Sequence, residues 1–116
     1  MNFFKKKHQE NEYQTALNQM NQTPVAKACE RIEFGEVTSD DQKTLYFVDL
    51  VVKHNPLVLN FEGVDVPTAN KVLAFIAGAV YALHGKTIKI DEKIYLFALS
   101  EEFLDGSLNE WLRQFE

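Results

Sequence analysis

The most regular hydrophobic pattern in the chain runs from residue 65 to residue 85. Apolar side chains recur there every three or four positions, which predicts a helix with one face on a sheet. We expect Asp65 to cap its first turn, Pro67 to lie in that turn, and Gly85 to be left-handed just after the end. The predicted buried face consists of Ala69, Val72, Leu73, Ile76, Val80 and Leu83.

The opposite side of this helix is apolar as well. Ala74, Gly78 and Ala82 recur at intervals of four, and Phe75 lies beside them. A helix that is apolar all round is buried on both sides. We therefore expect a second copy of the chain to cover this face, with Gly78 allowing the two backbones to approach. The alternative, a transmembrane span, is disfavoured because the unbroken apolar run is shorter than a bilayer requires.

The segment before this helix contains one ambiguous element. Residues 25–34 are expected to hold a first strand, and Gly35 allows a turn. In residues 40–54, the β-branched and aromatic side chains favour a strand. The capping-box sequence at 39–42 and one apolar face favour a helix, which we adopt. That face would consist of Leu45, Val48 and Val52.

The remaining segments complete the predicted fold. A short buried strand is expected at 56–61, and a hairpin from strands 86–90 and 93–99 joined at Asp91 and Glu92. Residues 100–106 read as irregular, and Ser107 is expected to cap a short C-terminal helix. The fold class is α/β: a two-layer sandwich with a small sheet, two main helices on one face, the short C-terminal helix, and a dimeric core. That last helix would present Leu108, Trp111, Leu112 and Phe115 on one face.

The first 24 residues differ in composition from the rest. Residues 1–7, MNFFKKK, combine apolar side chains with three lysines, which is typical of a short membrane-surface segment. The alternative is an ordinary frayed terminus. Residues 8–24 are rich in glutamine and asparagine and are expected to form a flexible linker before a core domain at 25–116. The predicted membrane-binding residues are Phe3, Phe4, Lys5, Lys6 and Lys7.

Composition and motifs disfavour several functions. Seventeen acidic against twelve basic residues give a net charge of −5, which argues against nucleic-acid binding. Cys29 is the single cysteine, so an internal disulfide is excluded. His8, His54 and His84 lack the spacing of a metal-ligand motif, and the acidic pairs lie in predicted turns or caps. We therefore predict a protein that is not an enzyme and has no catalytic residues, cofactor or metal.

Two motifs in the second half are more specific. The pattern F-x-x-G-x-x-Y-A-x-x-G occupies residues 75–85, within the helix sequence KVLAFIAGAVYALHGK, and Ile-Tyr-Leu follows at 94–96. With the strand sequence VLNF before them, these residues resemble the core domain of SepF over 56–106, nearly half of the chain. SepF proteins are bacterial cell-division proteins that bind the tubulin-like protein FtsZ.

The resemblance implies a role for each part of the chain. It implies an N-terminal membrane-binding segment, a flexible linker, and a dimeric α/β core that captures the C-terminal peptide of FtsZ and self-assembles further. It also favours the helix for residues 40–54. The family's partner-binding positions match Ala69 and Tyr95, and we expect Lys71 to join them in a groove for an extended, partly acidic peptide.

The predicted function is that of a cell-division adaptor. It would bind the FtsZ tail and an anionic membrane surface as a homodimer or larger homo-oligomer, and so tether division filaments during septum formation. Its location would be cytoplasmic, peripheral at the inner face of the membrane at the division site. One alternative is a soluble dimeric regulatory domain that binds a small ligand in its dimer cleft. Another is a small enzyme with its active site at the dimer interface.

Overall fold

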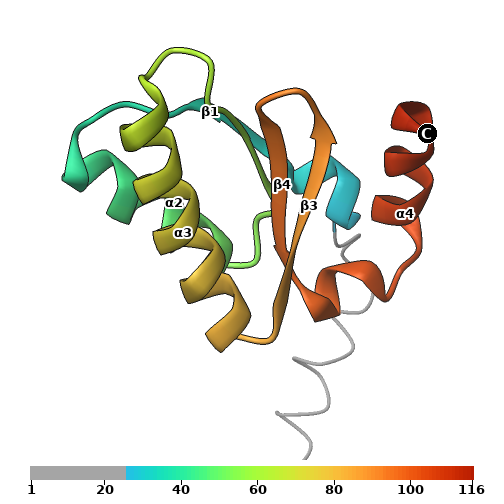
Figure 1. Ribbon diagram of the computed structural model, residues 1–116. Helices are drawn as coiled ribbons and strands as arrows, with labels where there is room; N and C mark the ends of the chain where they lie inside the picture. Colours follow the sequence, from blue (N-terminus) through green and yellow to red (C-terminus); the bar gives the residue numbers. More distant parts are fainter. Residues whose placement is uncertain (1–25) are drawn as a thin grey trace, which may run out of the picture.

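The computed structural model describes residues 26–116. Four strands form one mixed sheet in the order β1-β2-β4-β3 (Figure 1). β1 pairs in parallel with β2, whereas β2 and β3 each pair antiparallel with β4. The predicted membrane segment and linker lie outside the described residues. The strands are β1 (Glu33–Glu36), β2 (Leu57–Asn60), β3 (Gly85–Asp91) and β4 (Ile94–Leu99).

Helices lie on both faces of this sheet. The two long helices, α2 (Asp41–Val52) and α3 (Val66–Ala82), pack on one face, which confirms the predicted two-helix layer (Figure 1). The short helix α4 (Ser107–Leu112) lies on the opposite face with the 3-10 turn η1 (Ala28–Arg31). Two further 3-10 turns, η2 (Ser100–Phe103) and η3 (Arg113–Phe115), flank α4.

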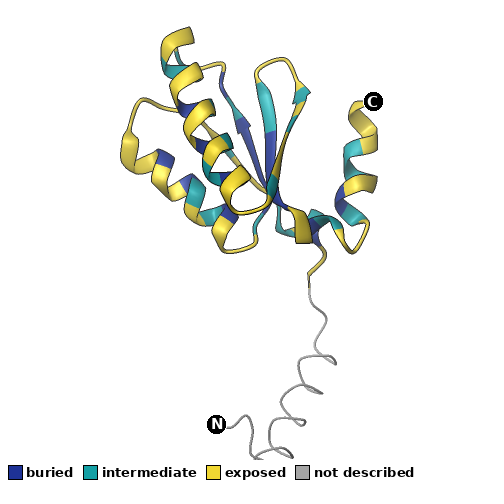
Figure 2. Cartoon of the chain, turned by 60° about the horizontal axis from the view of Figure 1, so that its bottom comes forward, coloured by how far each residue is buried: buried dark blue, intermediate teal, exposed yellow. Residues whose placement is uncertain are grey.

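The core is accordingly divided in two by the sheet. β4 is apolar at every position, as expected for a strand that is buried on both faces. Its Phe97 and Leu99 belong to the cluster under α2 and α3, and its Leu96 and Ala98 belong to the cluster under α4. Figure 2 shows the buried residues concentrated in the sheet and on the inner sides of the helices. The fold is thus the predicted sandwich with a partial third layer on its far face.

The start of α3 agrees with the sequence prediction. Asp65 is the N-cap, and its Oδ1 accepts a hydrogen bond of 3.0 Å from the amide of Thr68. Bonds from Thr68, first from its side chain and then from its amide, lower the pKa of Asp65. Pro67 lies in the first turn, where no helical partner is lost. Sequence-local signals therefore define this end of the helix.

The end of α3 differs from the prediction in two ways. His84, with φ 62°, takes the left-handed position instead of Gly85. Gly85 begins β3, where a Cβ would lie 2.5 Å from Cγ1 of Val80 and 2.7 Å from the carbonyl oxygen of Ala98. Glycine is therefore needed for close packing. Leu83, predicted as buried, is the C-cap residue and is exposed because the buried stripe ends one turn earlier.

The segment at 40–54 is the predicted helix, and Val48 of the predicted face packs against the core, but the other two residues of that face do not. Leu45 and Val52 are 48% and 44% exposed, whereas Phe47 and Val51 are buried. Several apolar residues follow one another here, so more than one face fits the pattern. The cap is Asp40, which accepts a bond from the amide of residue 42.

The predicted first strand at 25–34 is also wrong in its position. Residues 28–31 form η1, and the strand begins only at Glu33. Gly35 lies inside β1 instead of in a turn, and a Cβ there would be 2.6 Å from Cε1 of Phe47. The glycine lets the ring of Phe47 pack directly on the strand. The hairpin is confirmed, but its turn lies at Glu92 and Lys93, one residue later than predicted, because Asp91 still belongs to β3 and pairs with Ile94.

Asp105 joins the two segments that cover the far face. Its Oδ2 accepts a 3.0 Å bond from the amide of Ala28, and its Oδ1 accepts 2.8 Å bonds from the amide and hydroxyl of Ser107. These bonds, led by the one from Ala28, lower the pKa of Asp105. Ser107 was predicted to cap α4, but the N-cap is Gly106 and Ser107 is the first helical residue.

Candidate functional site

A groove runs between the start of α3 and the β3–β4 hairpin. Its volume is about 190 Å³. Ala69 contributes from the second turn of α3 and Tyr95 from the start of β4, so the structure brings these two predicted residues to one site. The groove is lined by Phe61, Val64, Val66, Ala69, Asn70, Leu73, Lys89, Glu92, Lys93 and Tyr95.

The aromatic part of the groove is held by the core. The ring of Tyr95 meets that of Phe61 edge-on, with centroids 5.4 Å apart, and stacks beside Phe97 at 6.4 Å. Phe61 and Phe97 are buried, and Tyr95 is partly buried. Tyr95 therefore has one side fixed by packing and another available to a ligand, so the groove is largely preformed.

The rim of the groove is basic, although the whole chain is acidic. Lys89 and Lys93 lie on the hairpin with Glu92 between them, and Nζ of Lys89 is 3.2 Å from Oε1 of Glu92. Among the residues that line the groove, two positive charges stand against one negative charge. The formal charge of the chain is −5, so this rim differs in sign from the average surface.

Lys71 lies elsewhere. Its Nζ is 3.5 Å from Oδ1 of Asp41 at the start of α2, and it borders a second hollow beside Phe75. The basic side chains of the groove are those of Lys89 and Lys93, which the sequence analysis did not single out. The alternating Lys-Thr-Ile-Lys-Ile strand and the turn after it were the signals that could have placed them next to the helix start.

The outer side of α3 is exposed in this single chain. Ala74, Gly78 and Ala82 face outward, Phe75 is 50% exposed, and Tyr81 is 81% exposed. A Cβ built on Gly78 would meet nothing within 4 Å. Figure 2 shows this side in yellow, the colour of exposed residues.

The apolar surface continues from α3 onto α2. Leu45 of α2 and Phe75 of α3 border the same hollow of about 300 Å³. Large exposed apolar patches of this kind mark interaction surfaces. Among residues 26–116, no helix has both the length and the apolar character that a membrane crossing requires.

Comparison with known proteins identifies the family. The family model described as "Cell division protein SepF" matches residues 39–101, more than half of the chain. That match includes α2, α3, β2 and the β3–β4 hairpin, and therefore the groove and the outer side of α3.

Individual relatives agree with the family model. The chain is 34% identical over 67 residues to the cell division protein SepF of Oenococcus oeni, covering 58% of this chain and 36% of the relative. It is 35% identical over 66 residues to the cell division protein SepF of Lachnoclostridium phytofermentans, covering 57% of this chain and 32% of the relative. A "Cell division protein sepF homolog" of Cyanophora paradoxa is 38% identical over 63 residues, covering 54% of this chain and 58% of the relative.

The chain thus spans about a third of the length of the first two relatives. The matched part contains three of the four strands (β2, β3 and β4) and the two-helix layer, and it carries the motifs of residues 75–85 and 94–96. On this agreement of family model, relatives and fold, the chain belongs to the SepF family of cell-division proteins.

Proposed function

We propose that this chain is a non-enzymatic adaptor that binds the C-terminal tail of FtsZ and holds division filaments at the cytoplasmic face of the membrane. Membership of a cell-division family supports the process. The groove between α3 and the hairpin supports the mode of binding, and it is the observation on which the proposal depends.

The groove suits an extended, partly acidic peptide. Its floor is apolar, with Tyr95 beside Leu73, and can accept an apolar side chain of the peptide. Ala69 is small and leaves room for a main chain to pass close to α3. Lys89 and Lys93 at the rim complement acidic residues and raise the rate of encounter. Lys89 and Lys93 take the role that we first expected of Lys71.

Self-association would use the outer side of α3. Small residues at 74, 78 and 82 allow two helices to approach closely, and Phe75 supplies apolar area. A dimer presents two grooves, so that even modest affinity for one tail becomes strong attachment to a filament with many tails. The membrane contact would come from Phe3, Phe4 and Lys5 to Lys7. A dimer carries two copies of this segment, so its attachment to the membrane is also multivalent.

Titration of a labelled FtsZ tail peptide, followed by fluorescence anisotropy, tests the groove. Lys93→Glu reverses a rim charge and should weaken binding by about three- to tenfold at low salt, with a smaller effect at high salt. Tyr95→Ala removes part of the floor and should weaken binding further. Its thermal unfolding is measured alongside, because Tyr95 also packs on Phe61.

Lys53→Glu provides the matched control, because Lys53 is an exposed lysine at the C-cap of α2 and does not line the groove. The control should bind like wild type. Equal affinity of wild type, Lys93→Glu and Tyr95→Ala would contradict the proposal that the tail occupies this groove. Equal weakening by Lys53→Glu and Lys93→Glu would show an unspecific effect of net charge.

A further inference from the structure

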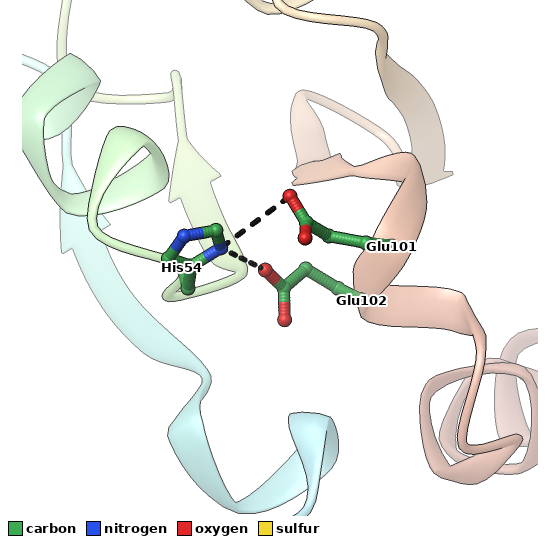
Figure 3. A group of neighbouring side chains, drawn as sticks. All are labelled: His54, Glu101 and Glu102. Atoms are coloured by element: carbon green, nitrogen blue, oxygen red, sulfur yellow. Dashed lines mark hydrogen bonds and ion pairs between the residues drawn. The ribbon is translucent and has the colours of Figure 1, made fainter. Parts of the chain in front are cut away.

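Three side chains converge at the end of the molecule where α2 ends and β4 leads into η2 (Figure 3). His54 follows α2, and Glu101 and Glu102 lie in η2. Nδ1 of His54 is 3.0 Å from Oε2 of Glu102 and 3.6 Å from Oε1 of Glu101. One ligand atom from each of the three residues lies within 4.8 Å of the other two.

These spacings resemble those between the ligands of one metal ion. Zinc binds imidazole nitrogen and carboxylate oxygen at about 2.0–2.2 Å, so two tetrahedral ligands are about 3.4 Å apart. The two distances from Nδ1 of His54 fall on either side of that value. A cation could therefore bind with small rotations of exposed side chains and no change of the backbone.

Arg31 fixes two of the three ligands in place. Its Nη2 pairs with Oε1 of Glu102, which leaves Oε2 directed at His54. Its Nε donates a 3.0 Å bond to the backbone carbonyl of His54. One guanidinium thus orients both Glu102 and the main chain that carries His54. Such outer contacts commonly orient ligands in metal sites.

Burial and charge favour a cation at this point. Glu102 is only 4% exposed, and Arg31 balances one carboxylate. With His54 neutral, the second carboxylate remains uncompensated, so a divalent ion would find a net negative charge. His54 and Glu101 are both exposed, which leaves water free to complete the coordination.

We propose that His54, Glu101 and Glu102 bind one divalent transition-metal ion, with zinc as the preferred ion. One imidazole with two carboxylates favours zinc over magnesium and calcium, which prefer oxygen ligands alone. The ion joins the end of α2 to η2 and so stabilises the folded chain. This inference is independent of the proposed function, because the cluster shares no residue with the groove.

Calorimetric titration of the full chain with zinc chloride tests the site. Wild type should bind one ion per chain at micromolar concentration, whereas magnesium chloride should give no comparable signal. His54→Asn and Glu101→Gln should each weaken zinc binding by at least about tenfold. His84→Asn is a matched control, because His54 and His84 both have positive φ, which asparagine tolerates.

A resonance of the imidazole gives a second readout. Zinc at Nδ1 should leave the hydrogen of His54 on Nε2, and a ¹⁵N spectrum of the ring should show this tautomer only after zinc is added. The proposal is overturned if wild type fails to bind at micromolar zinc, which would leave an ion pair alone. It is also overturned if His54→Asn binds as tightly as wild type, or if His84→Asn loses as much affinity.

Discussion

Replacement of Gly78 by lysine should affect the stability of the single chain and its self-association in opposite directions. Gly78 lies in the interior of α3, and a Cβ there would meet nothing within 4 Å. The single chain has room for either alanine or lysine. Because glycine is about 1 kcal/mol less favourable than alanine in a helix, and lysine is close to alanine, both variants should stabilise the folded chain slightly.

The same lysine has a different effect in a dimer that packs through Ala74, Gly78 and Ala82. An ammonium group forced between two apolar helices would cost about 3 kcal/mol or more without a partner. Since 1.4 kcal/mol corresponds to a factor of ten, the dimer dissociation constant should rise more than about a hundredfold. Gly78→Ala adds only a methyl group and should have a much smaller effect on the dimer.

Sedimentation at several concentrations, combined with thermal unfolding, measures both effects. Wild type and Gly78→Ala should have twice the mass of the 13.3 kDa chain at concentrations where Gly78→Lys has the single mass. The melting temperatures extrapolated to low concentration should rise in both variants. An unchanged mass of Gly78→Lys would place the interface elsewhere, and a melting temperature that falls in both variants would contradict the open space around Gly78.

Three further predictions concern packing, charge and the membrane. Gly85→Ala would place a Cβ about 2.7 Å from the oxygen of Ala98, so calorimetric unfolding should show a loss of about 1–3 kcal/mol; an unchanged melting temperature would be inconsistent with this contact. Folding lowers the pKa of Asp105, chiefly through the hydrogen bond from the amide of Ala28. The ionised carboxylate therefore stabilises the fold above its unfolded pKa of about 3.9. This stabilisation is lost as the pH falls through the folded pKa. The melting temperature of wild type should therefore exceed that of Asp105→Asn near pH 7, and the difference should shrink below about pH 4; a difference that does not depend on pH would refute the role of the charge. The full chain should float with anionic vesicles whereas a chain without residues 1–7 should not, and equal flotation of both would remove the membrane role of that segment.

Local signals were sufficient for much of the fold. The cap at Asp65, the proline after it and the buried series Val72, Ile76 and Val80 are all set within one helix, and the structure agrees with each. The same approach failed for α2, because Leu45 and Phe47 are both apolar and only the fit of a ring against Gly35 determines which is buried. Such long-range packing has no local signature.

The far face illustrates the same limit. The sequence predicted a C-terminal helix with Leu108 on its apolar side, but it did not indicate which surface that side would cover. The deciding contacts are between Asp105 and the segment at Ala28, which are 77 residues apart in the sequence. The uniformly apolar β4 was the available clue that both sides of the sheet are covered.

The candidate site was predicted only in part and only through resemblance. Ala69 and Tyr95 belong to different elements, and the residues alone gave no reason to pair them. Lys89 and Lys93 join them because the hairpin lies next to the start of α3. The cluster at His54 and Glu102 spans 48 residues of sequence, so no ligand spacing could have revealed it.

Mapping of the FtsZ tail peptide by NMR on the ¹⁵N-labelled chain tests the central claim most directly. Addition of peptide should shift the amide signals of Ala69, Asn70, Lys93 and Tyr95, and it should leave those of α4 unchanged. A shift confined to α4 and the edge strand β1, with the groove signals unmoved, would contradict the account.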